Sequence, residues 1–244
     1  MQTVSLKSIN TGHYALQEAF KSLRTNIGFC DADICTIAVT STHPNEGKSE
    51  VALRLAYAFA ETGAKTLLLD ADIRNSVLPG KLQAGRIPCG LSHILSGKEK
   101  TLSDAIYVTD VANLDILFTG AAAPNPAELL GNERFHLLLK ALKKTYTNVI
   151  IDCPPVGPVI DAAIVAKECD GTLIVVAQDA TKKRDAKKTV EQLRVSGAHI
   201  LGTVLNKTRR NTSGYGYGYG YGYGYGYGYG YDNTAQQVSQ NETA

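Results

Sequence analysis

The sequence predicts an α/β protein in which a mostly parallel sheet is flanked by helices. Short β-rich runs alternate with segments of helical periodicity along most of the chain, and this order of elements is typical of parallel sheets. Several strand-like runs are apolar at successive positions, which indicates that both faces of each strand are covered. A Gly-Lys-Ser sequence at residues 47–49 follows the first strand and opens a helix, as phosphate-binding loops do.

The expected elements follow one another in a regular order. Strands are expected at residues 36–40, 66–70, 114–119, 148–152, 171–177 and 200–206. Helices are expected at residues 49–62, 132–146 and 181–196. A further helix at about residues 14–28 precedes this core, with Leu16, Phe20, Leu23 and Ile27 along one face.

The end of the chain has a different composition. From residue 214 to residue 231 glycine and tyrosine alternate strictly, and a polar segment follows. A glycine at every second position opposes persistent β structure, so we expect a disordered tail. We therefore divide the chain into a leading helical segment (residues 1–30), a P-loop domain (31–212) and the tail (213–244). The tail carries nine tyrosines: Tyr215, Tyr217, Tyr219, Tyr221, Tyr223, Tyr225, Tyr227, Tyr229 and Tyr231.

Composition narrows the functional classes. The 244 residues suffice for one large domain, and 44% hydrophobic and 20% charged residues are an ordinary balance for a soluble protein. A net charge of +2 favours neither nucleic acid nor a membrane surface as a partner. The five cysteines lack metal-ligand spacing, and an odd number without a disulfide framework indicates a reducing cytoplasm. We expect no signal peptide, and no apolar run approaches the ~20 residues that a membrane helix needs.

Residues 42–49, THPNEGKS, match the frame of a P-loop except that Thr42 replaces its first glycine. Such a loop directs backbone N–H groups at the β-phosphate, and Gly47 permits a close approach. Lys48 is expected to reach the β- and γ-phosphates of ATP, and the Ser49 hydroxyl to bind Mg²⁺. A chance strand-turn-helix is the alternative. Nucleotide contacts are expected from Pro44, Asn45, Glu46, Gly47, Lys48, Ser49 and Glu50.

Carboxylates end two of the expected strands. Asp152 follows Val-Ile-Ile, as the aspartate that holds Mg²⁺ through water does in P-loop proteins. Asp70 follows Leu-Leu-Leu, and Asp72 lies two residues further on. Side chains at the carboxyl ends of parallel strands project into the crevice where such sheets bind ligands. These carboxylates therefore support an Mg-ATP site, although Asp70 and Asp152 could instead cap the loops that follow them.

Residues 70–74, DADIR, resemble the Walker A′ motif of the CpsD/CapB-type bacterial tyrosine kinases of capsule and exopolysaccharide synthesis. The resemblance continues through residues 90–92, 124–130 and 151–155, and the tyrosine cluster completes it. It spans nearly the whole chain and implies a MinD/ParA-like P-loop fold. The sequence departs from the family in its regular Gly-Tyr repeat. It departs again at Lys21, where the family has the first arginine of a Glu-x-x-Arg-x-x-Arg motif.

The resemblance implies catalytic roles for Lys48, Asp70, Asp72 and Asp152. Ser49, Asp70 and Asp152 would hold the metal ion. Asp72 is similar to the residue proposed as the base for the tyrosine hydroxyl, whose free pKa is about 10. It could equally be an outer ligand of magnesium. Arg74 could brace phosphates or pair with a carboxylate.

The resemblance also implies an ATP-dependent kinase that phosphorylates the tyrosines of its own tail in trans, within a ring-shaped homo-oligomer. A coil of the tail's length spans roughly 25 Å, enough to reach a neighbouring subunit. The implied location is cytoplasmic, peripheral to the membrane through an activator protein of the polysaccharide chain-length regulator type. A phosphotyrosine phosphatase and substrate enzymes of polysaccharide synthesis are further implied partners, and nucleic acid is not.

Two charged clusters lie on the expected helices. Glu18, Lys21 and Arg24 recur every three residues, and the resemblance makes them an oligomerisation motif. The alternative is a solvated face with an ion pair worth ~0.2–0.5 kcal/mol. A second cluster is most simply a solvated helix face, with binding to an acidic partner or nucleic acid as the alternative. Its members are Lys182, Lys183, Arg184, Lys187 and Lys188.

Two other functions stay open at this point. A ParA/MinD-like ATPase switch resembles this chain in fold, but its P-loop carries an early lysine where residues 41–43 are STH. MinD-like proteins also end in an amphipathic membrane helix, which a Gly-Tyr repeat cannot form. The other function is a non-catalytic scaffold that senses ATP and recruits partners through its tail. ATP-dependent formation of phosphotyrosine distinguishes the kinase from both.

Overall fold

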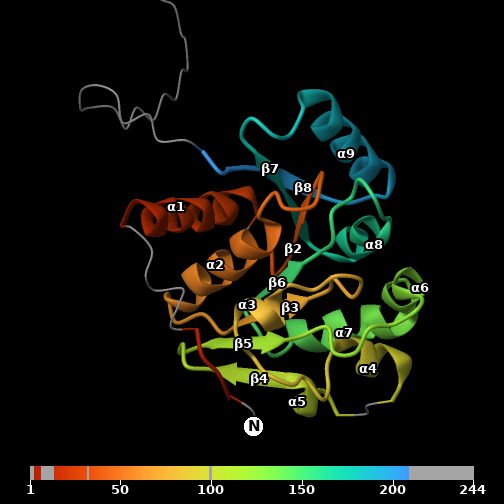
Figure 1. The fold of residues 1–244 in the computed structure, drawn as a ribbon. Coiled ribbons are helices and arrows are strands. Elements are labelled where there is room, and N and C mark those ends of the chain that lie inside the picture. Colours follow the sequence, from red (N-terminus) through yellow and green to blue (C-terminus); the bar gives the residue numbers. More distant parts are fainter. Residues whose placement is uncertain (1–2, 7–13, 32, 99–100, 209–244) are drawn as a thin grey trace, which may run out of the picture. The chain divides into compact units, whose positions relative to one another are not determined.

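The computed structural model describes residues 3–6, 14–31, 33–98 and 101–208. They contain one eight-stranded sheet with the order β1-β4-β5-β3-β6-β2-β7-β8, which runs from the bottom to the top of Figure 1. Neighbouring strands of this sheet are parallel, apart from the antiparallel pair of β4 and β5. The expected mostly parallel sheet is therefore confirmed. The nine tail tyrosines lie outside the described residues.

The bounds of the elements agree closely with the sequence pattern in the core. The strands are β1 (Thr3–Val4), β2 (Thr36–Ser41), β3 (Thr66–Asp70), β4 (Ile106–Thr109), β5 (Leu114–Leu117), β6 (Asn148–Asp152), β7 (Gly171–Ala177) and β8 (Ile200–Asn206). The helices are α1 (Tyr14–Cys30), α2 (Lys48–Ala60), α3 (Leu78–Lys81), α4 (Leu91–Ser96), α5 (Leu102–Ala105), α6 (Pro126–Leu130), α7 (Glu133–Lys143), α8 (Asp161–Glu168) and α9 (Lys183–Val195).

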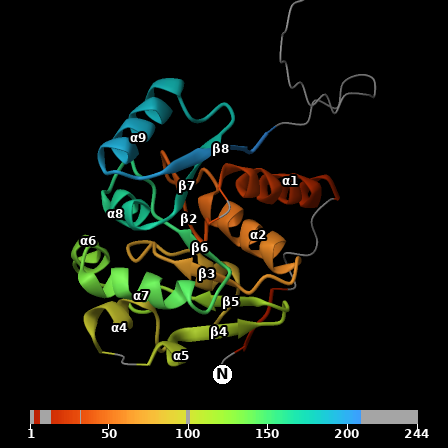
Figure 2. The same ribbon diagram turned by 180° about the vertical axis from the view of Figure 1, so that it is seen from behind.

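Helices cover both faces of the sheet. In β3, Leu67 and Leu69 pack into one buried cluster with α4, α7 and α8, whereas Leu68 packs into a second cluster with α2. Figures 1 and 2 show the same division, with α1 and α2 on one side of the sheet and α4, α7, α8 and α9 on the other. A strand between two helical layers is buried on both faces, which explains the continuous apolar runs in the sequence. Among the described residues, no helix is both long and apolar enough to cross a membrane.

The sequence analysis missed the shorter elements. β1 has two residues and β4 has four, too few to give a clear periodicity. β4 pairs antiparallel with β5, and β5 ends at Leu117 rather than at the expected residue 119. The unexpected helices are α3, α4, α5 and α6, of four to six residues, and α8, of eight residues. They connect the larger elements and do not change the expected architecture.

The topology brings the ends of the central strands to one edge of the sheet. β6 lies between β3 and β2, and Asp70 at the end of β3 is in register with Asp152 at the end of β6. The P-loop follows β2 at the same edge. β7 and β8 also end there, with Ala177 opposite Asn206. This edge therefore carries the residues of the site that the sequence predicted, together with the end of β8, which the sequence analysis did not include.

Candidate active site

The P-loop connects β2 to α2 and depends on glycine at one position. Gly47 has a φ of 95°, and a Cβ atom there would lie 2.1 Å from the side-chain nitrogen Nδ2 of Asn206. Thr42, where the P-loop frame has its first glycine, is not among the described residues with positive φ. Its hydroxyl accepts a hydrogen bond from Thr189 on α9 at 3.2 Å, and its carbonyl accepts one from the Gly157 N–H at 3.1 Å. Thr42 therefore anchors the loop to two neighbouring segments.

The end of β8 holds the P-loop in place, a contact that the sequence analysis did not predict. Asn206 Nδ2 donates to the Glu46 carbonyl at 2.9 Å, and Lys207 Nζ donates to the Asn45 carbonyl at 2.5 Å. The Glu46 side chain accepts a hydrogen bond from the His43 N–H at 2.9 Å and so braces the loop from within. The sequence could have indicated this contact, because Asn206 and Lys207 lie at the carboxyl end of a parallel strand and that end faces the ligand crevice.

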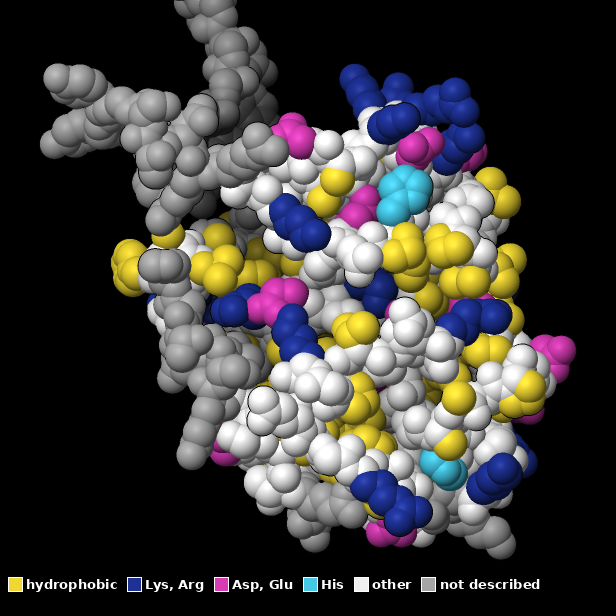
Figure 3. Space-filling model, viewed as in Figure 1, with side chains coloured by type: hydrophobic (Ala, Val, Ile, Leu, Met, Phe, Trp, Pro, Cys, Tyr) yellow, Lys and Arg dark blue, Asp and Glu magenta, His cyan; other side chains and the backbone are white. Residues whose placement is uncertain are grey.

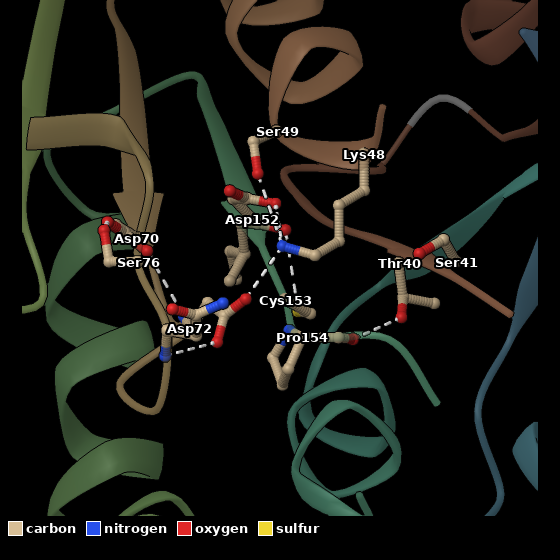
Figure 4. A network of polar contacts seen from close by, with 12 residues as sticks. Thr40, Ser41, Lys48, Ser49, Asp70, Asp72, Ser76, Asp152, Cys153 and Pro154 are labelled. Atoms are coloured by element: carbon tan, nitrogen blue, oxygen red, sulfur yellow. Dashed lines mark hydrogen bonds and ion pairs between the residues drawn. The ribbon is translucent and has the colours of Figure 1, made fainter. Parts of the chain in front are cut away.

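Lys48 extends from the start of α2 toward the carboxylates of β3 and β6 (Figure 4). Its Nζ lies 2.9 Å from Asp72 Oδ2 and 3.5 Å from Asp152 Oδ1. The same nitrogen lies 3.3 Å from the Ser49 hydroxyl. Asp70 accepts a hydrogen bond from the Asp72 N–H at 3.2 Å. The structure thus brings together all four residues that were expected to be catalytic.

Burial and charge set the ionisation of these groups. Burial raises the pKa of Asp70 well above its usual range, and the neighbouring charge of Asp152 adds to this. Burial also raises the pKa of Asp152, although Lys48 and Ser49 partly counteract it. Burial acts to lower the pKa of Lys48, but the charges of Asp152 and Asp72 outweigh it and leave that pKa above its usual value. Two buried carboxylates with raised pKa values favour a further cation beside them.

A cavity of about 470 Å³ opens beside these residues. All three carboxylates are buried, but Asp72 lines this cavity, whereas Asp70 and Asp152 do not. All of the expected nucleotide contacts except Glu46 also line it. Arg74, Lys81 and Lys207 contribute further positive charge to the lining. The cavity therefore combines the P-loop, several cations and two carboxylates, Asp72 and Glu50, that a bound molecule can reach.

Two charged residues at the cavity have partners within the chain. Arg74 donates two hydrogen bonds to Asp161, at 2.6 and 3.0 Å, so in this structure it pairs with a carboxylate. Glu50, an expected nucleotide contact, forms ion pairs with Arg54 and Lys81. Burial acts to raise the pKa of Glu50, but Lys81 and Arg54 outweigh it and leave that pKa below its usual value. The negative charge of Glu50 is thus balanced locally.

The site fits a magnesium ion only if other ligands complete the shell. Among the described residues, no group of three or more His, Cys, Asp or Glu side chains is placed to hold a metal ion by itself. Mg²⁺ typically takes one or two carboxylates together with waters and phosphate oxygens, so it does not need such a group. Ser49, Asp70 and Asp152 supply a hydroxyl and two carboxylates in one place, which is the donor chemistry that Mg²⁺ prefers.

The expected oligomerisation residues have different surroundings on α1. Lys21 Nζ lies 2.8 Å from Glu18 Oε1, and these side chains are 44% and 39% exposed. Arg24 donates a hydrogen bond to the Ala58 carbonyl on α2. Arg24 therefore contributes to packing within the chain, whereas Glu18 and Lys21 are accessible to another molecule. Their role in assembly stays a prediction.

The basic cluster lies at and just before the start of α9. Its five lysine and arginine side chains are exposed, whereas Thr189 and Leu193 on the same helix are buried. Figure 3 shows the resulting group of dark blue side chains over α9. This arrangement agrees with the simpler interpretation, a solvated face of an amphipathic helix.

The fold and the site define a P-loop nucleotide-binding protein. Residues 34–195 match the family model described as an AAA domain. Tyrosine-protein kinase CpsD of Streptococcus agalactiae serotype III is 41% identical over 199 residues, which cover 82% of this chain and 85% of the relative. Putative tyrosine-protein kinase CapB of Staphylococcus aureus is 34% identical over 206 residues, covering 82% and 89%. The chain belongs to this family of bacterial tyrosine-protein kinases.

Solved structures agree with this assignment. The chimerical protein CapA2B2 superimposes with a TM-score of 0.76 at 33% identity, covering 85% of this chain and 93% of that chain. The kinase domain of the Escherichia coli tyrosine kinase ETK gives a TM-score of 0.76 at 31% identity, covering 83% and 80%. MinD of Pyrococcus horikoshii, solved with Mg-ADP, gives 0.60 at 29% identity, covering 70% and 69%. The tyrosine kinases are thus more similar to this chain than MinD is, and the expected resemblance is confirmed.

Proposed function

We propose that this chain transfers the γ-phosphoryl group of ATP to tyrosine hydroxyls, including those of its own tail. The observation that carries the proposal is the position of Asp72, which lines the cavity 2.9 Å from Lys48 Nζ. A carboxylate that faces the cavity beside the phosphate-binding lysine can receive the proton of an incoming hydroxyl. Asp70 and Asp152 do not line the cavity, which favours metal binding for them over contact with a tyrosine.

In this proposal Lys48 changes its partner. Phosphate oxygens of ATP compete for the Lys48 ammonium and release Asp72 as a proton acceptor. The tyrosine oxygen forms a bond to the γ-phosphorus, and the bond from that phosphorus to the bridging oxygen breaks. ADP leaves with the electron pair of that bond, and the phenolic proton passes to Asp72. Lys48 and the backbone N–H groups of the P-loop stabilise the charge on the phosphates.

Mg²⁺ would be held by Ser49 and Asp152, with Asp70 beside them. When bound, it would neutralise charge on the β- and γ-phosphate oxygens. The raised pKa values of Asp70 and Asp152 support this assignment, because a cation relieves the cost of two neighbouring buried carboxylates.

The biological setting follows from family membership and is also part of the proposal. Phosphoryl transfer would occur in trans within a ring of subunits and would regulate capsular or extracellular polysaccharide synthesis. A membrane protein of the chain-length regulator type would activate the kinase and hold it at the membrane. A phosphotyrosine phosphatase would reverse the reaction, and polysaccharide synthesis enzymes would be further substrates.

The test is mass spectrometry of the purified chain after incubation with Mg-ATP and the cytoplasmic segment of the membrane activator. We expect phosphotyrosine within residues 215–231, and none in a Lys48→Met control treated in the same way. ATP hydrolysis without phosphotyrosine would instead identify an ATPase switch. ATP binding without either reaction would identify a scaffold.

A further inference from the structure

An apolar groove lies beside the active-site cavity, between α9 and the loop that leads into α8. It measures about 570 Å³, within the usual range of ligand pockets. Ile160 and Val195 at this groove are 66% and 80% exposed, although both are large aliphatic residues. Figure 3 shows hydrophobic side chains gathered below α9. The other apolar residues of its lining are Val156, Pro158, Val159 and Ala163.

The groove and the active-site cavity share a wall. Pro158 and Val159 line both of them. The segment that carries these residues is fixed to the P-loop, because the Gly157 N–H donates to the Thr42 carbonyl at 3.1 Å. A Cβ atom on Gly157 would lie 2.5 Å from that carbonyl oxygen, so the two backbones approach as closely as glycine allows. A side chain in the groove therefore lies at a fixed position relative to the phosphate-binding loop.

The spacing of the tyrosines in the tail suits binding to the active-site cavity and the groove at the same time. Between residues 214 and 231 a tyrosine occurs at every second position. In an extended peptide, residues two apart point to the same side and lie about 6.6 Å from each other. This short spacing suits two sites that share one wall, with one tyrosine in the active-site cavity and the next in the groove. The glycines between them let the peptide backbone lie close to that wall.

We propose that the groove is a docking subsite for the tyrosine two residues from the acceptor, in the tail of another copy of this chain. The inference rests on the proposed kinase function and adds a rule of substrate choice, an aromatic residue two positions from the acceptor. An aromatic ring contributes a large apolar contact area. Glu191 and Gln192, which are exposed at the groove, can accept a hydrogen bond from the tyrosine hydroxyl. The repeat would then supply an acceptor and an anchor in every register except the last at one end.

The experiment compares two synthetic peptides with one acceptor tyrosine each. Each peptide is a Gly-Tyr repeat that keeps a single tyrosine. In one peptide all the remaining tyrosines are replaced by phenylalanine, and in the other they are all replaced by alanine. The enzyme is the full chain with its nine tail tyrosines replaced by alanine, so that its own tail does not compete. We expect a KM about tenfold lower for the phenylalanine peptide with an unchanged kcat, because an aromatic anchor adds binding without touching the reacting atoms.

Variants of the groove connect this preference to the structure. Ile160→Asp and Val195→Asp are expected to reduce the difference in KM to less than about twofold, since each places a charge where the ring would bind. Both residues are exposed, so the fold tolerates the changes. The matched control is Leu137→Asp on α7, which is also an exposed aliphatic residue, at 53%, and lines neither cavity. It should retain the full difference in KM.

Three results would overturn the proposal. The first is an equal KM for the two peptides in the enzyme with an unaltered groove. The second is a preference for the phenylalanine peptide that persists in both groove variants. The third is a loss of this preference in the Leu137→Asp control as well. A groove variant that dissociates the oligomer but keeps the peptide preference would assign the groove to contacts between folded domains instead. Failure of the kinase function itself is recognised separately, because the unaltered chain would then leave its own tail unphosphorylated.

Discussion

Lys48 and Asp72 form a buried ion pair across the active site. The Lys48 Nζ lies 2.9 Å from Asp72 Oδ2, and the two side chains are only 11% and 6% exposed. Lys48 begins α2 and Asp72 follows β3, so the pair joins the P-loop to the segment after β3. If ATP phosphates take the ammonium, nucleotide binding releases Asp72 in the same step. ATP binding would therefore determine whether Asp72, the proposed base, is free to accept a proton.

Lys48→Met is expected to reduce autophosphorylation by about 100-fold or more, because it removes a positive charge from the phosphates. The fold should persist, but the melting temperature should fall, since Asp72 and Asp152 lose their cation. Phosphotyrosine blots and thermal melts measure the two effects. Wild-type levels of phosphotyrosine in the folded variant would refute the assignment of the ATP site.

Asp72→Asn and Asp70→Asn should have different effects. Asp72→Asn is expected to slow phosphoryl transfer by about 100-fold or more with little loss of ATP affinity, because it removes the base. Asp70→Asn should lower both the rate of phosphoryl transfer and the affinity for ATP, because it alters the metal site. ATP affinity in the presence of Mg²⁺ is measured beside the initial rate for each variant. If Asp72→Asn loses affinity and rate in parallel, Asp72 belongs to the metal shell and is not the base.

Transfer in trans is tested by mixing two defective subunits. One carries Lys48→Met with an intact tail, and the other is active but lacks residues 214–231. We expect phosphate on the tail of the inactive subunit, and light scattering should show the assembly shrinking as each phosphate adds a charge of about −1.5 to −2. Each subunit alone is the control. Phosphate confined to subunits with a working P-loop of their own would show transfer in cis.

Two charged residues of α1, Glu18 and Arg24, should both affect assembly, but only Arg24 should also affect folding. Glu18→Ala is expected to lower the mass of the oligomer in sedimentation, with the melting temperature unchanged, because Lys21 is the only hydrogen-bond or ion-pair partner of Glu18 among the described residues. Arg24→Ala should lower both, because it also removes the hydrogen bond to Ala58 on α2. An unchanged oligomer in the Glu18→Ala variant would remove this residue from the interface.

Asp170 is expected to make stability depend on pH. Its carboxylate accepts hydrogen bonds from the N–H groups of Cys35 and Thr36, at 3.1 and 2.8 Å, and pairs with Lys143. Burial acts to raise the pKa of Asp170, but Lys143 and Thr36 outweigh it and leave that pKa below its usual value. A group with a depressed pKa in the folded state stabilises the protein above its unfolded-state pKa. That contribution is lost as the pH falls through the folded-state value.

Asp170→Asn should therefore lower the free energy of unfolding by about 1–3 kcal/mol at pH 7. The difference from the parent chain should shrink below about pH 4, where the carboxylate begins to protonate. Denaturant unfolding at several pH values measures this, with Asp104→Asn, an exposed aspartate, as the control. An equal difference at pH 3 and pH 7 would contradict the proposed cause.

Much of the core could be predicted because its signals are local. The strands β2, β3, β6 and β7 are continuous apolar runs, and a strand covered on both faces leaves that pattern wherever it occurs. Lys48 and Ser49 follow the first of these strands in a P-loop frame. Asp70 and Asp152 end two others. Their convergence could also be predicted, since parallel strands end at a common edge.

The sequence by itself thus determined the class of fold, the phosphate-binding loop and the carboxylates beside it. Only the tertiary structure decided that Asn206 and Lys207 hold the P-loop, that Arg74 pairs with Asp161, and that Asp72 faces the cavity while Asp70 does not. The physical reason is separation along the chain. Arg74 and Asp161 are 87 residues apart, and Asn206 is 160 residues from Glu46. Local periodicity specifies which elements form, whereas such contacts depend on how the finished sheet and its loops pack together.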